Sequence, residues 1–250
     1  MLSVISRGYH VCILFVNISI EYIAKTHLGI YNGPVSHRLF KQQLYGQFAR
    51  VGSALASDKR LEILDLLAQA PRHVDALAVE AEMPVANVSQ HLQVLRNARL
   101  IESDRDGTRI IYRLADKGVM HLWLALRSVA ASRLAEVDQI VAQFAVGDSG
   151  ATPLSRDELQ ESLSGDQVFL IDVRPALEFE SGHLPGAISI PVEELPSRLD
   201  ELPRDRRIVA YCRGAYCLFA DEAVEMLRAQ GFEAERLDGG WPEWHAEGRP

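Results

Sequence analysis

The sequence predicts two domains of different fold class, the first mainly α-helical and the second α/β with a parallel sheet flanked by helices. Apolar residues recur at helical spacing from Leu39 to Asn97 and are followed by a β-hairpin pattern. After Leu154, short apolar strands alternate with helical segments, which is typical of a parallel sheet. A stretch rich in glycine and small polar residues separates the two patterns, so we place a linker at 146–153.

Composition and charge also distinguish the two halves of this 250-residue chain. Residues 35–145 hold 14 Lys and Arg against 12 Asp and Glu, whereas residues 153–250 hold 10 against 20. A net charge of +2 in the first segment and −10 in the second indicates separate roles, and it is compatible with a basic, phosphate-binding face in the first half. Three cysteines, an odd number, do not predict a disulfide framework, so we expect a reducing, cytoplasmic setting.

The first 34 residues do not share the pattern of the rest. The apolar run from Val11 to Ile20 is too short to span a bilayer as a helix, so no membrane association is predicted. We interpret 1–34 as a non-native or disordered extension, produced by a mis-assigned start upstream of a GTG codon for Val35. The alternative is an additional β-strand, because Val16 to Ile23 alternates in part.

Residues 35–145 form the predicted helical domain. Apolar spacing predicts one helix from Leu39 to Leu55 and a second that begins after an N-cap at Ser57. Pro71 ends the second helix, a third covers Val74–Glu82, and a fourth runs from Val85 to Asn97. The order is therefore helix, turn, helix, followed by the hairpin.

The fourth helix carries the polar side chains of most interest. Its apolar residues Val88, Leu92 and Leu95 face the core. The opposite face holds side chains of the types that read bases or hold phosphates: Asn87, Ser89, Gln90, His91 and Gln93. A solvated polar face is the alternative for an isolated helix, but the hairpin that follows favours the nucleic-acid interpretation.

This region resembles the ArsR family of winged-helix repressors. The resemblance is carried by Ser89-x-His91-Leu92-x-x-Leu95-x-x-Ala98-x-Leu100-Ile101 and by the wing Gly107-x-Arg109-x-x-x-Tyr112. It implies that the fourth helix enters the major groove of double-stranded DNA, with Arg105 and Arg109 near backbone phosphates. Arg99 stands where the family usually has glycine.

Many members of that family sense metals through a thiol pair or through acidic and histidine ligands. The third predicted helix has no cysteine, and His121 has no second histidine at ligand spacing. The sequence therefore predicts neither a metal site nor another cofactor.

A long amphipathic helix closes the first domain. Between Lys117 and Phe144 apolar residues recur mostly every three or four positions, and such a stripe needs a partner surface. Together with the resemblance, it predicts a homodimer that places two recognition helices on a palindromic operator.

The second domain, 154–250, is organised around a cysteine loop. Strands are predicted at Val168–Val173, Ala187–Ile190 and Ile208–Tyr211, with a helix at Asp221–Gln230. Cys212 follows the third strand directly, where loop amides and a helix N-terminus favour a thiolate, so we predict that it is the nucleophile. A buried structural cysteine is the alternative.

The second half of the chain resembles rhodanese domains. The motifs are Leu170-Ile171-Asp172-Val173-Arg174, Glu178-Phe179-x-x-Gly182-His183-Leu184, the cysteine loop, and Leu237-x-Gly239-Gly240-Trp241-x-x-Trp244. The resemblance implies that Cys212 takes sulfur from a sulfane-sulfur donor as a persulfide. The active-site loop is then Arg213, Gly214, Ala215, Tyr216 and Cys217, whose amides surround the anionic sulfur. We interpret Asp172, Arg174 and Glu178 as supports of the loop, and His183 as structural.

Two residues of the loop limit its chemistry. Leu218 stands where related phosphatases need an arginine, and Cys217 stands where many sulfurtransferases carry a cation. Both changes argue against phosphate chemistry and weaken the case for thiosulfate. Cys217 is either a resolving thiol for a Cys212 persulfide or simply a small residue at the start of a helix.

The leading hypothesis is a dimeric DNA-binding repressor whose rhodanese domain senses reactive sulfur through Cys212, with the change relayed through 139–153. The rival is a working sulfurtransferase in which the winged helix is a tether or autoregulator. A third possibility is a rhodanese fold used only to bind a partner.

Overall fold

The structure is a computed structural model that describes residues 36–144, 153–165 and 167–249. The predicted extension 1–34 and the linker, apart from Pro153, lie outside the described residues. The chain divides into two compact units, 1–48 and 49–250, and each is described by itself. The first contributes only the beginning of α2 (His37–Leu55) to the described part. The predicted domain limits at 145 and 154 stay a prediction.

The helices of the first half follow the predicted order. They are α3 (Asp58–Gln69), α4 (Val74–Glu80) and α5 (Val85–Asn97), and α4 ends two residues earlier than expected. One face of each helix contributes fully buried side chains to a shared core: Ile63, Leu64, Leu77, Leu92 and Leu95. Burial of each such side chain contributes about 1.5–3 kcal/mol, which explains why these amphipathic segments pack as a bundle.

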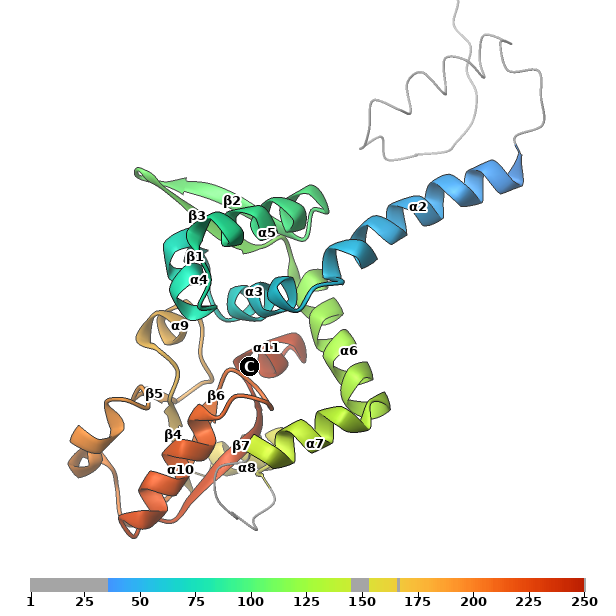
Figure 1. Cartoon of the computed structure of the whole chain (residues 1–250). Helices are drawn as coiled ribbons and strands as arrows, with labels where there is room; N and C mark the ends of the chain where they lie inside the picture. Colours follow the sequence, from blue (N-terminus) through green and yellow to red (C-terminus); the bar gives the residue numbers. More distant parts are fainter. Residues whose placement is uncertain (1–35, 145–152, 166, 250) are drawn as a thin grey trace, which may run out of the picture. The chain divides into compact units, whose positions relative to one another are not determined.

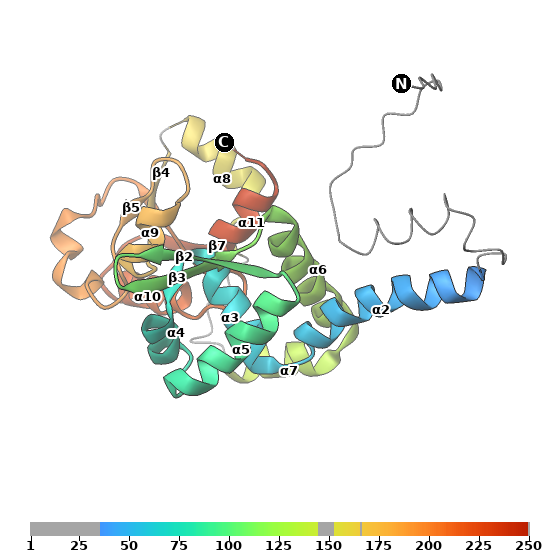
Figure 2. The same ribbon diagram turned by 90° about the horizontal axis from the view of Figure 1, so that it is seen from above.

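The predicted hairpin is confirmed. Strand β2 (Ile101–Asp106) pairs antiparallel with β3 (Arg109–Leu114), and Asp106 opposite Arg109 closes a two-residue turn that begins with Gly107 at φ +60°. Both views show the hairpin beside α5, against which β2 packs (Figures 1 and 2). A short strand that the sequence did not reveal, β1 (Arg72–His73), joins the other edge of β3.

Arg99 adopts a backbone conformation that favours glycine. Its φ is +61°, in the left-handed region, which costs an L-residue about 1–2 kcal/mol. Arg99→Gly is therefore expected to raise the free energy of unfolding by about 0.5–1 kcal/mol, after the larger backbone entropy of glycine in the unfolded chain is included. Urea denaturation measures the change. Arg99→Ala is the control, and equal stability of the two variants would contradict the expectation.

The long closing helix was predicted wrongly as one element. It consists of α6 (Lys117–Arg133) and α7 (Ala135–Phe144), separated by Leu134, whose backbone is extended at φ −111° and ψ 103°. Figure 1 shows the sharp bend between them. Neither glycine nor proline occurs between 130 and 138, and one extended residue leaves the three-to-four spacing intact on both sides. The pattern therefore did not reveal the break.

The second half is a parallel four-stranded sheet in the order β5-β4-β6-β7. The strands are β4 (Val168–Asp172), β5 (Ile188–Ser189), β6 (Arg207–Cys212) and β7 (Ala234–Gly240). The first three match the predicted strands. The fourth was missed, because Asp238-Gly239-Gly240 interrupts its apolar pattern.

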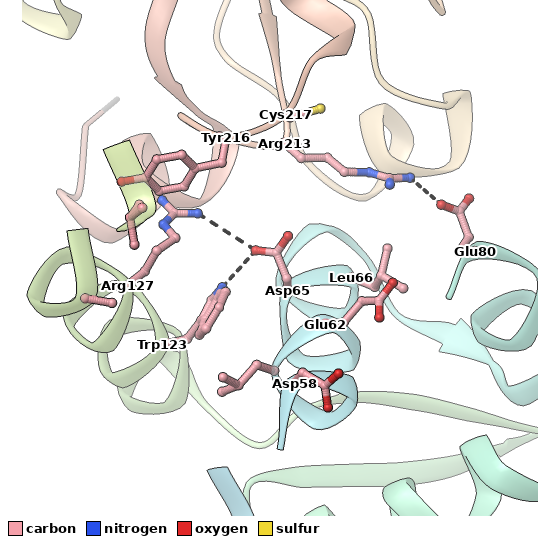
Figure 3. Close-up of a pocket in the computed structure, with 14 residues that line it drawn as sticks. Asp58, Glu62, Asp65, Leu66, Glu80, Trp123, Arg127, Arg213, Tyr216 and Cys217 are labelled. Atoms are coloured by element: carbon pink, nitrogen blue, oxygen red, sulfur yellow. Dashed lines mark hydrogen bonds and ion pairs between the residues drawn. The ribbon is translucent and has the colours of Figure 1, made fainter. Parts of the chain in front are cut away.

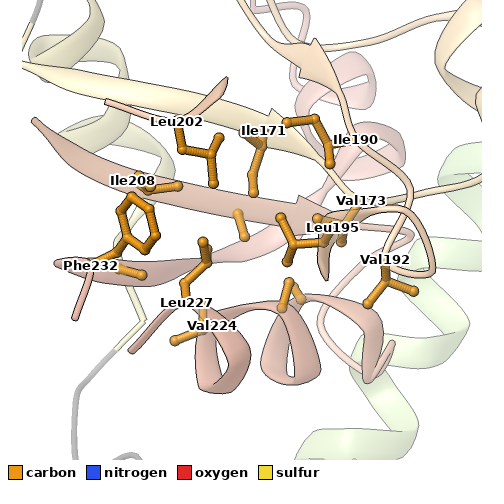
Figure 4. Close-up of a cluster of buried hydrophobic side chains, with 14 of the residues drawn as sticks. Ile171, Val173, Ile190, Val192, Leu195, Leu202, Ile208, Val224, Leu227 and Phe232 are labelled. Atoms are coloured by element: carbon orange, nitrogen blue, oxygen red, sulfur yellow. The ribbon is translucent and has the colours of Figure 1, made fainter. Parts of the chain in front are cut away.

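Helices cover both faces of this sheet and fix the direction of each β6 side chain. They are α8 (Arg156–Ser164), α9 (Ala176–Ser181), α10 (Phe219–Ala229) and α11 (Trp241–Ala246), with short 3₁₀ turns η1 (Leu195–Ser197) and η2 (Leu199–Glu201). Ile208, Ala210 and Cys212 belong to the cluster that packs between the sheet and α10. Figure 4 shows this cluster. Val209 and Tyr211 belong to the cluster that contains Trp244. Cys212 is thus the last β6 residue on the α10 face.

Candidate functional site

Cys212 lies at the carboxyl end of β6, where active loops of parallel sheets occur. Its side chain is only 2% exposed, and its Sγ donates to the carbonyl oxygens of Cys217 at 3.3 Å and Gly214 at 3.7 Å. At the same strand end, a Cβ on Gly240 would lie 2.1 Å from the Cys212 carbonyl oxygen. Only glycine at 240 allows β7 to approach the loop this closely.

The loop from Arg213 to Cys217 is a tight turn held from several sides. The Cys217 amide donates to the Gly214 carbonyl at 3.2 Å, and Arg236 donates to the Ala215 carbonyl at 3.0 Å. The Tyr216 ring lies 5.6 Å from the Arg127 guanidinium carbon. All five predicted loop residues are therefore gathered around Cys212.

The two thiols differ in their readiness to ionise, and in the opposite sense to the expectation for Cys212. Burial raises the pKa of Cys212 well above its usual value, and the neighbouring Cys217 raises it further, against weaker opposition from the backbone of Gly214 and Ala220. The hydrogen bond from Cys212 lowers the pKa of Cys217, assisted by the backbone of Phe219 and Arg213 and by the Arg213 charge. The two directions together favour the thiolate on Cys217 over that on Cys212.

Iodoacetamide at neutral pH is therefore expected to label Cys217 before Cys212, with an initial rate at least about tenfold higher, because the thiolate is the reactive form. As pH rises, labelling of Cys217 should reach its plateau at a lower pH than a free cysteine does. Mass spectrometry of the loop peptide at several times measures both rates. Cys217→Ser is the control, in which Cys212 should remain slow; faster labelling of Cys212 in the wild type would contradict the assignment.

The three residues predicted to support the loop form two groups rather than one. Arg174 makes a fully buried pair with Asp172 at 2.5 Å, and Tyr211 donates to the same carboxylate at 2.6 Å. Arg174 also donates to the Gly182 carbonyl at 2.7 Å. This group joins β4, β6 and the turn after α9, and none of its bonds reaches the carboxylate of Glu178.

Glu178 belongs to the second group, which contacts the loop directly. Its carboxylate, fully buried, accepts from Arg213 at 2.6 Å and also pairs with Arg72 of β1. Glu80, the last residue of α4, binds Arg213 at 2.7 Å and lies 3.7 Å from Arg72. Arg72 and Glu80 were missed as site residues, since single charges in a helical domain carry no sequence signal for a partner about a hundred positions away.

His183 has the surroundings of a structural residue. Its Nδ1 lies 2.9 Å from the Phe179 carbonyl oxygen, and its ring stacks on Phe179 at 3.8 Å between centroids. Both contacts lie within the turn that follows α9, which agrees with the predicted role.

A cavity of about 530 Å³ lies between the loop and the helices α3, α6 and α7 (Figure 3). Asp65 is central to it, accepting from the Trp123 indole at 2.8 Å and lying 3.9 Å from Arg127. Burial raises the pKa of Asp65, and these two partners oppose the rise. In Figure 3 the Cys217 sulfur points away from Asp65, whereas the Tyr216 ring lies beside Arg127.

The predicted nucleic-acid face is gathered on α5 and the hairpin. Asn87, Ser89, Gln90 and Gln93 are exposed, and His91 is half-buried. The Ser89 hydroxyl donates back to the Val85 carbonyl at 2.8 Å, which leaves its lone pairs available to a ligand. Arg105 and Arg109 are exposed near the hairpin tip.

Metal binding and membrane insertion each need a structural feature of their own. No group of three or more His, Cys, Asp or Glu side chains is placed to hold a metal ion within 36–144, 153–165 and 167–249. Over the same ranges, no helix combines the length and the apolar character needed to cross a membrane.

Comparison with known proteins identifies both halves. The family model described as "Bacterial regulatory protein, arsR family" matches residues 57–103, and that of the rhodanese-like domain matches 155–247. The HTH-type transcriptional regulator Rv0324 of Mycobacterium tuberculosis is 47% identical over 210 residues, covering 84% of this chain and 92% of the relative. A sulfurtransferase of Allochromatium vinosum is 34% identical over 86 residues, covering 34% of this chain and 78% of the relative.

Among solved structures, the homodimeric winged helix-turn-helix DNA-binding domain of Mb0332 from Mycobacterium bovis is 41% identical. It covers 42% of this chain and 94% of its own, with a TM-score of 0.38. A rhodanese-related protein from Thermoplasma volcanium is 28% identical and covers 40% of this chain and 96% of its own, with a TM-score of 0.36.

Proposed function

We propose that this chain, which belongs to the arsR family of bacterial regulatory proteins and ends in a rhodanese-like domain, regulates transcription in response to reactive sulfane sulfur. The observation that carries the proposal is the direct contact between the cysteine loop and the helix-turn-helix: Arg213, adjacent to Cys212, is bound by Glu80 of α4. A sulfur-handling domain that served only as an appended enzyme would need no such contact.

On DNA, α5 enters the major groove and the wing arginines lie near phosphates. The protein acts in the cytoplasm as a homodimeric repressor on a palindromic operator. Support for the dimer comes from the apolar side chains that α6 and α7 leave exposed, among them Val129, Leu134, Ile140 and Phe144. Apolar groups of this size at one end of a helical domain are typical of an interface.

At the loop, the Cys212 sulfur attacks the outer sulfur of a donor R–S–SH while its proton passes to the Cys217 thiolate. The donor S–S bond breaks, RS⁻ leaves, and Cys212 holds the persulfide. After Cys217 loses its proton again, its thiolate attacks the inner sulfur of Cys212, and HS⁻ leaves with formation of the Cys212–Cys217 disulfide. The lowered pKa of Cys217 suits the second step.

Mass spectrometry of the loop peptide after polysulfide treatment tests the proposal, run beside a gel shift on DNA from upstream of the protein's own gene. Stoichiometric modification with altered DNA binding is expected. Sustained sulfur transfer to a thiol, with DNA binding indifferent to polysulfide, would contradict sensing and favour the sulfurtransferase alternative.

Gln90→Ala tests the reading face. Loss of one specific base contact is expected to weaken operator binding by about 1–3 kcal/mol while binding to unrelated DNA changes little. Fluorescence anisotropy with both duplexes measures the two affinities. Gln230→Ala, the same change at an exposed position after α10, is the control. Equal operator affinities of the two variants would show that α5 does not read bases through this face.

A further inference from the structure

The cysteine loop and the winged helix share a closed ring of alternating charges. Glu178 and Arg213 come from the rhodanese-like half, and Arg72 and Glu80 come from the winged helix. Each charge has two opposite neighbours, and Arg72 is 3% exposed. Charges at this depth remain ionised only when they are paired, so each half stabilises the buried charges of the other.

Gln69, the last residue of α3, gives the loop a second, uncharged contact. It is 1% exposed, and its Nε2 donates to the Arg213 carbonyl at 2.9 Å. Its Oε1 accepts from Arg174 at 3.2 Å. A buried amide without partners is costly, and both of these partners belong to the rhodanese-like half.

We propose that Gln69 and Glu80 are positioning residues of the cysteine loop, supplied by the winged helix, so that the conformation of the loop and the setting of α4 depend on each other. Glu80 holds the Arg213 guanidinium and Gln69 holds its carbonyl group, which places both ends of the first loop residue under the control of the winged helix. The inference rests on the proposed function in taking this loop as the site of sulfur chemistry and α5 as the helix that binds DNA.

The loop has a reason to move when its thiols react. Reduced Cys212 donates its proton to the carbonyls of Gly214 and Cys217, which lie on either side of the turn. A persulfide anion or a disulfide has no proton to donate there, so these carbonyls face a sulfur that repels them. Relaxation of the turn displaces Arg213, which lies between Cys212 and Gly214 in the chain.

A displaced Arg213 acts on the DNA-binding element over a short path. Glu80 ends α4, and α5 begins at Val85 after the turn that contains Pro84. The Met83 amide donates to the Ala78 carbonyl at 2.9 Å and the Val88 amide to the Pro84 carbonyl at 3.1 Å, so the turn is bonded to both helices. By linkage, modification of the loop and binding of DNA then change each other's affinity equally.

The first test is the pH profile of Cys217 alkylation in the full chain, which needs neither sulfur nor DNA. In Glu80→Gln, Arg213 retains only Glu178 as a counter-charge, so it favours the Cys217 thiolate more strongly and the midpoint should fall by about 0.5 pH unit. Arg213→Gln should raise the midpoint, and adding Glu80→Gln to it should change nothing further. Glu82→Gln makes the same change at an exposed position and should have the same alkylation midpoint as the wild type.

The second test measures operator affinity before and after iodoacetamide has alkylated both loop thiols, so that Cys212 has no proton left to donate, on DNA from upstream of the protein's own gene. Alkylation should change the Kd of the wild type for operator DNA at least about fivefold. In Glu80→Gln and in Gln69→Leu, alkylation should change this Kd less than about twofold. The Gln69 variant keeps the test valid if Glu80→Gln fails to fold.

The positioning role would be overturned if Glu80→Gln, like Glu82→Gln, had the alkylation midpoint of the wild type while Arg213→Gln still raised it. An equal alkylation response of operator affinity in wild type and both variants would overturn the link to α4. An unreactive loop toward polysulfide would contradict the proposed function alone, since neither test uses a sulfur donor.

Discussion

Glu178→Gln is expected to lower the free energy of unfolding by about 3–5 kcal/mol, because it leaves the buried Arg72 and the half-buried Arg213 without their shared carboxylate. The isosteric amide keeps the volume of the side chain, so the loss reports charge rather than a cavity. Urea denaturation followed by circular dichroism measures it.

Glu180→Gln is the matched control for this change. Glu180 lies two residues further along α9 and is exposed, so its loss should change stability by less than about 0.5 kcal/mol. Equal stabilities of the two variants would show that the buried ring does not stabilise the fold.

Cys212→Ser is expected to abolish the response to sulfane sulfur while operator affinity stays within about twofold of the wild type. The serine hydroxyl can donate to the same carbonyls as the thiol, so the reduced conformation of the loop is preserved. A persulfide cannot form on oxygen, so the resolving step has no substrate. Gel shifts with and without polysulfide measure the difference.

Cys12→Ser makes the same chemical change at the remaining cysteine outside the loop, and this variant should respond as the wild type does. If the Cys212 variant still releases or gains DNA after polysulfide treatment, another group is the sensor and the loop chemistry proposed above is wrong.

The fold was largely predictable from local patterns. Helical spacing located α3 and α5, because it reflects which side of a helix is buried. The Asp106-Gly107 signal located the hairpin, because a two-residue turn requires a positive φ that glycine adopts readily. The break at Leu134 and the strand β7 were missed because neither changes a local pattern of spacing in a recognisable way. A single extended residue leaves the spacing unchanged, and Gly240 of β7 serves a close approach to Cys212 rather than a pattern of burial.

The site was predictable only within each half. Cys212 and its loop follow from the strand that ends there, and the residues of α5 follow from the exposed face of one helix. Gln69, Arg72 and Glu80 could not be found in this way, since their partners lie in a segment of different fold class. The ionisation of the cysteine pair also depends on burial, which no sequence spacing reveals.

Because the ring of Arg72, Glu80, Glu178 and Arg213 is electrically neutral and largely withdrawn from water, mobile ions have little access to it. Contacts with DNA phosphates behave in the opposite way, since each releases condensed counterions and weakens steeply as ionic strength rises. Salt therefore acts on one half of the regulator and spares the other. We therefore expect the affinity for DNA to fall as ionic strength rises, while the ion pair between Arg213 and Glu80 keeps the same strength.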